Sequence, residues 1–240
     1  MLGLPDTVNT CLFDLDGVLT DTASVHRAAW KEMFDAFLAG RGQPPFTDKD
    51  YADFVDGKPR ADGVRDFLAS REISLPEGGA DDPPGAESVH GLGNRKNELL
   101  VALIAEQGVD AYDGSIRFVR AARDAGMRCA VVSSSANCRE ALAAAGIEDL
   151  FDVRVDGRTA AKEHLRGKPA PDTFLAAARL LGVRPPDAAV FEDALAGVEA
   201  GAAGGFGVVV GVDRHGRADE LRAHGAGVVV ADLGDLLEPR

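Results

Sequence analysis

The chain has 240 residues, of which 45% are hydrophobic and 27% are charged. This composition is typical of a globular protein with enough apolar residues for one large domain or two small ones. The formal net charge of −13 disfavours nucleic acid and anionic membranes as partners, because both are bound through clustered Lys and Arg. A metal cation, or a phosphorylated metabolite held in a locally basic pocket, is compatible with this charge.

The first predicted element is a buried strand within the apolar run 7–13, and the strand pattern then stops. Residues 23–110 contain amphipathic helical patterns over 24–40 and 94–108, and no Val-rich segment. Between those two patterns, residues 75–93 are dense in Pro, Gly and acidic residues and predict a long loop. We therefore expect a separate helical domain inserted after the first strand.

The remainder of the chain alternates short apolar runs with helical stretches. The Val-rich runs are 127–133, 188–191, 206–212 and 226–232. The helical stretches, most of which end in Gly, are 115–126, 137–146, 171–182 and 194–205. Continuous apolar strands separated by helices are typical of parallel strands covered on both faces. We predict an α/β fold with a doubly wound, Rossmann-like parallel sheet over 1–22 and 111–240, and an inserted α-helical domain over 23–110.

Cysteine usage and the apolar segments bear on the location of the protein. The three cysteines Cys11, Cys129 and Cys138 are odd in number and have no metal-ligand spacing, which favours free thiols in a reducing cytoplasm. We see no signal peptide at the N-terminus and no apolar stretch long enough to span a membrane. We expect a cytoplasmic monomer.

Polar side chains gather where the predicted strands end. The first strand ends in Asp14 and Asp16, the run 127–133 ends in Ser133, and the run 188–191 is followed by Glu192 and Asp193. Since the carboxyl ends of parallel strands share one edge of an open sheet, these groups should share a cleft. A further polar group, Lys168, stands before a Pro-rich helix start.

This combination of residues indicates phosphoryl transfer. Four carboxylates in one cleft need a hard cation, and Mg²⁺ suits a site that also handles phosphate. An ionised Asp14 is a competent nucleophile toward a phosphoryl group, and Asp16 can serve as general acid and base. Ser133 can donate a hydrogen bond to a phosphoryl oxygen. The alternative readings are a polar turn at Asp14 and Asp16, a helix N-cap at Glu192–Asp193 and a surface lysine at 168.

Four segments resemble the motifs of the haloacid dehalogenase superfamily, in the family's order. They are FDLDGVLTDT, VVSSSAN, KPAPDTF and FEDALAGVEAG. The helical insert after the first motif resembles the cap of subclass I, within which the chain is most similar to the β-phosphoglucomutase family. The resemblance covers nearly the whole chain.

The resemblance implies a role for each core residue. Asp14 matches the nucleophile that becomes an aspartyl phosphate, and Asp16 matches the general acid/base, whose main-chain carbonyl would be a Mg²⁺ ligand. The metal site would consist of Asp14, Asp16, Glu192 and Asp193. The residues that hold the phosphoryl group or lie beside it would be Ser133, Ser134, Asn137 and Lys168.

The resemblance also implies substrate-binding residues in the insert, which would be the cap domain, and at Thr22 in the hinge just before it. They are Thr22, His26, Trp30, Arg60, Lys96 and Asn97. The matching His links the cap to the acid/base, and the matching Arg holds the phosphate that is not being transferred. The alternative is that His26, Arg60 and Lys96 are ordinary surface residues. The loop 75–93 is longer than in small mutases, and Asp113 stands where relatives carry Pro.

The activity implied is Mg²⁺-dependent phosphoryl transfer on a small phosphorylated sugar. The first interpretation is a mutase that converts β-glucose 1-phosphate to glucose 6-phosphate through a bisphosphate. The second is a sugar-phosphate phosphatase with the same intermediate and water as acceptor. A non-catalytic metabolite sensor is disfavoured because no nucleophile or metal acid is missing, and a dinucleotide enzyme is disfavoured because no G-x-G-x-x-G turn follows the first strand.

Overall fold

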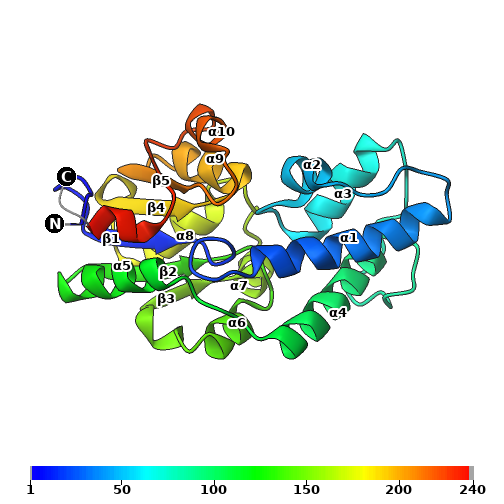
Figure 1. Cartoon of the computed structure of the whole chain (residues 1–240), viewed down its shortest axis with the longest axis horizontal. Helices are drawn as coiled ribbons and strands as arrows, with labels where there is room; N and C mark the ends of the chain where they lie inside the picture. The colour runs from blue at the N-terminus through cyan, green and yellow to red at the C-terminus, as the bar shows by residue number, and fades with distance from the viewer. Residues whose placement is uncertain (1, 238–240) are drawn as a thin grey trace. The chain divides into compact units, whose positions relative to one another are not determined.

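The computed structural model describes residues 2–237, which fold into two compact units (Figure 1). The first unit is formed by Met1–Asp21 with Val109–Arg240, and the second by Thr22–Gly108. The chain thus leaves the first unit after Asp21 and returns to it at Val109. Each unit has its own hydrophobic core.

The first unit contains a six-stranded parallel sheet with the order β3-β2-β1-β4-β5-β6. The strands are β1 Thr10–Phe13, β2 Arg128–Val132, β3 Val153–Val155, β4 Ala188–Glu192, β5 Val208–Val212 and β6 Val228–Val230. β1 lies at the centre, with Phe13 paired to Val131 on one side and to Phe191 on the other. This sheet confirms the predicted doubly wound α/β fold.

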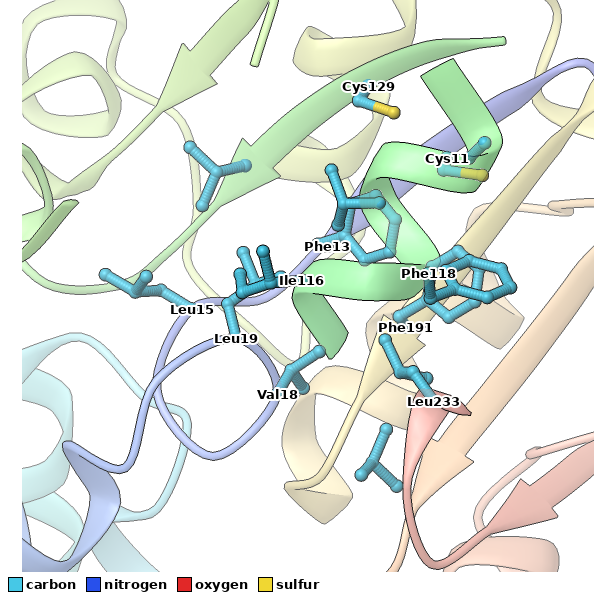
Figure 2. Close-up of a cluster of buried hydrophobic side chains, with 14 of the residues drawn as sticks. Cys11, Phe13, Leu15, Val18, Leu19, Ile116, Phe118, Cys129, Phe191 and Leu233 are labelled. Carbon is cyan, nitrogen blue, oxygen red and sulfur yellow. The ribbon is translucent and has the colours of Figure 1, made fainter. Parts of the chain in front are cut away.

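Alternate side chains of each strand point to opposite faces of the sheet, and each face has its own apolar cluster. On one face, Phe13 and Phe191 stack at 4.5 Å between ring centroids, and Phe118 of α5 packs edge-on at 6.2 Å from Phe13 (Figure 2). On the other face, Leu12 packs in a cluster with Phe174 of α8. The helices of this unit are α5 Asp113–Asp124, α6 Cys138–Ala144, α7 Gly157–Glu163, α8 Asp172–Leu181, α9 Leu195–Ala203 and α10 Ala218–Ala223. Short 3₁₀ turns lie at Glu148–Leu150, Pro185–Asp187 and Leu233–Leu237.

One strand and two α-helices of this unit are absent from the sequence prediction. β3, α7 and α10 are three, seven and six residues long, and β3 carries an arginine between its two valines. Such short segments carry too little hydrophobic periodicity to stand out from a loop. The prediction of five strands was therefore one strand short.

All the regular secondary structure in the second unit's described residues is helical. Its elements are α1 Ala23–Ala39, α2 Asp48–Asp50, a π-helical turn at Tyr51–Val55, α3 Arg60–Ser70 and α4 Val89–Gln107. Four aromatic side chains pack together in its core, with Phe34 at 5.3 Å from Trp30, 5.1 Å from Phe46 and 4.1 Å from Phe67, each between ring centroids. α1 also packs on α4 through Ala29 and Leu100.

The predicted loop 75–93 is too long at its C-terminal end. α4 already begins at Val89, because the hydroxyl of Ser88 accepts a hydrogen bond from the amide of Gly91 at 2.9 Å and caps the helix. Two glycines in the first turns, Gly91 and Gly93, lower helix propensity and hide this start in the sequence. The loop proper therefore ends at Ser88.

All three cysteines are buried free thiols. Within residues 2–237, no helix combines the length and the hydropathy required to cross a bilayer.

Asp156, at the carboxyl end of β3, starts α7 and supports the neighbouring loop. Its carboxylate accepts hydrogen bonds from the amide of Thr159 at 2.8 Å and from Nε of Arg154 at 3.0 Å. Burial alone would raise the pKa of Asp156, but these hydrogen bonds outweigh it and hold the pKa below its usual range. The next residue, Gly157, donates to the carbonyl of Ser135 at 3.0 Å.

We expect Asp156→Asn to destabilise the protein by about 1 kcal/mol at neutral pH, because charged hydrogen bonds to Thr159 and Arg154 become neutral. The folded pKa is depressed, so this contribution is fully present above about pH 4, the usual range of Asp, and is lost as the pH falls through the folded pKa. Melting temperatures of wild type and variant between pH 7 and pH 3 test this. A difference that stays constant down to pH 3 would contradict the ionic role.

Candidate active site

The carboxyl ends of β1, β2 and β4 bring the predicted core residues together. Asp14 directly follows β1, and its amide donates to the carbonyl of Phe191 at 2.9 Å, so the β1–β4 ladder continues into the site. Ser133 follows β2, and its amide donates to the carbonyl of Val155 at 3.0 Å. Glu192 is the last residue of β4. Parallel pairing without offset therefore places three polar side chains at neighbouring strand ends.

Lys168 is the centre of this arrangement. Its ammonium group is buried and contacts Oδ1 of Asp14 at 2.5 Å, Oε1 of Glu192 at 2.5 Å and the carbonyl of Val132 at 3.0 Å. An ammonium has three N–H donors, so these three acceptors satisfy it. Burial lowers the pKa of Lys168, but the two carboxylates outweigh burial and raise it above its usual range. Lys168 is therefore a fixed positive charge.

The carboxylate of Asp14 lies in an apolar and acidic environment. Burial raises the pKa of Asp14 well above its usual range, and Glu192 and Asp16 raise it further, while Lys168 opposes both effects. One buried lysine thus does not compensate the acids around it. An additional cation next to Asp14 would favour its ionised, nucleophilic form.

The residues around Asp14 fit a hard metal ion. Asp14, Glu192 and Asp193 each present a carboxylate oxygen, and these oxygens lie within 4.8 Å of one another. Three carboxyl groups lie around the single ammonium of Lys168, so the cluster is predominantly acidic. All-oxygen ligands with this charge suit Mg²⁺. The side chain of Asp16 is not part of this cluster.

Two glycines make room for the acidic cluster, and the sequence analysis assigned no role to either. A Cβ atom on Gly17 would overlap the carboxylate of Asp193. Gly17 also has a backbone φ of +92°, which residues other than glycine rarely adopt. A Cβ atom on Gly197, in the first turn of α9, would overlap the carboxylate of Glu192. Both positions therefore require glycine as long as the side chains of Asp193 and Glu192 occupy their present positions.

The loop after β2 lies next to Asp16. The hydroxyl of Ser133 donates to Oδ2 of Asp16 at 3.3 Å and accepts from the amide of Ser135 at 3.0 Å. Ser134 and Asn137 are partly exposed in the same loop, where the amide of Asn137 donates to Oγ of Ser135 at 3.2 Å. A Cβ on Gly157 would stand 2.8 Å from the carbonyl of Ser134, so this glycine lets α7 approach the loop.

Arg214 supports the Asp16–Gly17 turn from the loop after β5, and sequence reasoning missed it. Its Nε donates to the carbonyl of Gly17 at 3.0 Å, and its Nη1 pairs with Asp232 at 3.0 Å. The guanidinium also stacks on Tyr112, with 3.8 Å from Cζ to the ring centroid. Arg214 and Gly17 are 197 residues apart in the sequence, so no local motif connects them.

The helical unit brings three of its predicted residues together. Nζ of Lys96, a buried residue of α4, lies 3.1 Å from Nδ1 of His26 and 5.0 Å from the ring centroid of Trp30, both on α1. Thr22 is buried at the start of α1, and Asn97 is half-buried on α4.

Arg60 lies at the first residue of α3, apart from that cluster. Its Nη2 donates to Oδ1 of Asn94 at 3.0 Å, and among the described residues no carboxylate lies within ion-pair distance of it. Burial lowers the pKa of Arg60, although the guanidinium remains charged. It is a partly buried cation whose hydrogen-bond partner is neutral.

The chain is similar to known proteins over most of its length. The chain is 58% identical to a β-phosphoglucomutase of Mycobacterium tuberculosis (strain CDC 1551 / Oshkosh), over 99% of this chain and 94% of the relative. It is 35% identical to a β-phosphoglucomutase of Bacillus subtilis (strain 168), over 83% of this chain and 82% of the relative.

A solved structure is also similar over nearly the full length. The crystal structure of a β-phosphoglucomutase from Clostridium difficile superimposes with a TM-score of 0.77 and 27% identity, covering 95% of this chain and 93% of the other. Residues 8–205 match the family described as haloacid dehalogenase-like hydrolase. The chain belongs to the haloacid dehalogenase-like hydrolase family.

Proposed function

We propose that this chain is a β-phosphoglucomutase, which interconverts β-glucose 1-phosphate and glucose 6-phosphate by Mg²⁺-dependent phosphoryl transfer. The observation that carries the proposal is the 58% identity to a curated β-phosphoglucomutase over 99% of the chain. This similarity extends through Thr22–Gly108 as well as through the sheet-bearing unit. It therefore favours the mutase over a phosphatase, whose catalytic core would be the same.

In the first half of the reaction, a carboxylate oxygen of Asp14 forms a bond to phosphorus and the P–O bond of the donor breaks. Asp16 gives its proton to the leaving oxygen. In the second half, a sugar hydroxyl attacks the phosphorus of the aspartyl phosphate, Asp16 takes the hydroxyl proton, and Asp14 is released. Ser133 already donates to Asp16, so its hydroxyl is near the proton path.

Charge control at Asp14 comes from fixed groups of the core. Lys168 holds the Asp14 carboxylate and puts its positive charge beside the incoming phosphoryl oxygens. Asp14, Glu192 and Asp193, with the main-chain carbonyl of Asp16, would hold the Mg²⁺ ion. When bound, Mg²⁺ supplies charge neutralisation between the carboxylate and the phosphate.

We infer that the helical unit serves as the cap that selects the sugar. A sugar bisphosphate carries a second phosphate that is not reacting, and a cation without an internal carboxylate partner suits that phosphate. Arg60 is such a cation. Lys96, His26 and Asn97 would contact the sugar or its phosphates, as the resemblance implies.

Asp14→Asn is expected to lower mutase activity by at least about 10⁴-fold, because an amide cannot attack phosphorus and no second nucleophile replaces it. Turnover and acid-stable phosphorylation with a labelled donor measure this, and the melting temperature serves as the folding control. Substantial activity in a clean preparation would contradict the covalent mechanism.

Removal of divalent metal with EDTA should abolish activity, and Mg²⁺ should restore it. Gly197→Ala should raise the Mg²⁺ concentration needed for half-maximal activity, and for half of the Mg²⁺-induced rise in melting temperature, because its methyl group displaces Glu192. The matched control is Gly227→Ala, whose Cβ would have no neighbour closer than 3.9 Å. Full activity in excess EDTA would exclude the metal role.

Arg60→Ala should reduce isomerisation of β-glucose 1-phosphate by about 10²-fold or more, because a charge-assisted phosphate contact is lost. Phosphorylation of Asp14 by acetyl phosphate should hardly change, since this donor has no second phosphate. Arg65→Ala, on the same helix but paired with Glu77, is the matched control.

Two results would contradict this role of Arg60. Equal losses with both donors would mean that Arg60 supports the fold or the core. No loss with either donor would make Arg60 a surface residue and favour the phosphatase.

A further inference from the structure

Asn94, in the second turn of α4, uses its whole side-chain amide in one network. Oδ1 accepts from Nη2 of Arg60 at 3.0 Å, while Nδ2 donates to the carbonyls of Ala80 at 2.9 Å and Asp82 at 2.8 Å. A guanidinium can only donate and a carbonyl can only accept, so the orientation of the amide is determined. The short amide of asparagine can both accept a hydrogen bond from the guanidinium and donate hydrogen bonds to the two carbonyls.

The loop that supplies these two carbonyls is closed by its own hydrogen bonds. The carboxylate of Asp82 accepts a hydrogen bond from Oγ of Ser88 at 2.5 Å. The main-chain amide of Asp82 donates to the carbonyl of Gly79 at 2.9 Å. Ser88 in turn caps α4. Gly78 has a φ of +73°, and a Cβ there would overlap Asp82. The loop is therefore a fixed platform at the start of α4.

The stem of Arg60 lies against the same helix. A Cβ atom on Gly93 would stand 3.2 Å from Cγ and 3.4 Å from Nε of Arg60, so glycine leaves the space that the stem occupies. Asn94 then fixes the end of the side chain without a negative charge. An aspartate in its place would neutralise the guanidinium, and an apolar residue would leave it without this hydrogen bond.

We infer that Asn94, held by the carbonyls of Ala80 and Asp82, is a positioning residue that orients Arg60 toward the non-reacting phosphate of the sugar substrate while preserving its full charge. The inference rests on the proposed function, and it gives the loop that ends at Ser88 a role in substrate recognition. Asn94 acts through Arg60 and does not itself contact the substrate.

The test measures binding of β-glucose 1,6-bisphosphate by calorimetry in an Asp14→Asn background, where no phosphoryl transfer consumes the ligand. Asn94→Asp should raise the dissociation constant at least tenfold, because the carboxylate pairs with Arg60 and cannot donate to the two carbonyls. In the otherwise wild-type enzyme it should raise KM more than it lowers kcat, and phosphorylation by acetyl phosphate should not change.

Two controls separate this role from general effects on charge and folding. Gln107→Glu adds the same charge at the exposed C-terminal end of α4 and should leave the dissociation constant within twofold. Asn94→Asp should weaken binding less in the Arg60→Ala background than in the presence of Arg60, because the aspartate then has no guanidinium to neutralise.

The inference is overturned if Asn94→Asp changes the dissociation constant less than twofold, or if its effect persists undiminished in the Arg60→Ala background. A large effect of Arg60→Ala without any effect of Asn94→Asp would reject the inference and leave the proposed function intact. No effect of Arg60→Ala on binding, with no isomerisation by the wild-type enzyme, would reject the proposed function itself.

Discussion

In the sheet-bearing unit, one buried ammonium group holds together the polar groups at the strand ends. Lys168 is nearly inaccessible, and its three acceptors come from Asp14, Glu192 and Val132, at the ends of three adjacent strands. Removing any one acceptor would leave part of a buried charge without compensation, which is far more costly than losing a surface ion pair. The lysine therefore fixes the position of the Asp14 carboxylate, and under the proposed function this preorganisation would lower the reorganisation needed for nucleophilic attack.

The sequence was informative where apolar runs end in polar residues. Parallel strands pair without large offsets, so Asp14, Ser133 and Glu192 could be placed at one edge of a sheet from the ends of their runs. The parallel sheet itself followed from the same runs. β3 could not be predicted in this way, because Val-Arg-Val is too short to show a pattern. The early start of α4 was hidden because Gly91 and Gly93 mask a helix that depends on the cap of Ser88.

Other features of the site depend on contacts between residues that are far apart in the sequence. Nothing near Gly17 indicates that Arg214 will bind its carbonyl, and nothing near Arg60 indicates that Asn94 will accept its hydrogen bond. The close approach of Gly197 to Glu192 follows from the path of the turn between β4 and α9, which only coordinates reveal. Such residues define the orientation of catalytic and binding groups, whereas motifs identify the groups themselves.

The two units contain charged groups of opposite sign: the acids around Asp14 in one unit, and Arg60 in the other. Several arginines of this chain pair closely with carboxylates, as in Arg71–Asp50 and Arg166–Asp172, both at 2.8 Å. Arg60 instead has a neutral partner and stands at the positive end of the α3 dipole, where a cation is unfavourable. An anion would offset both penalties. The acids around Asp14 conversely require a cation. Under the proposed function, the second phosphate of a doubly phosphorylated sugar would be that anion for Arg60, whereas a simple monophosphate has none. The neutral partner of Arg60 is therefore consistent with the proposed mutase.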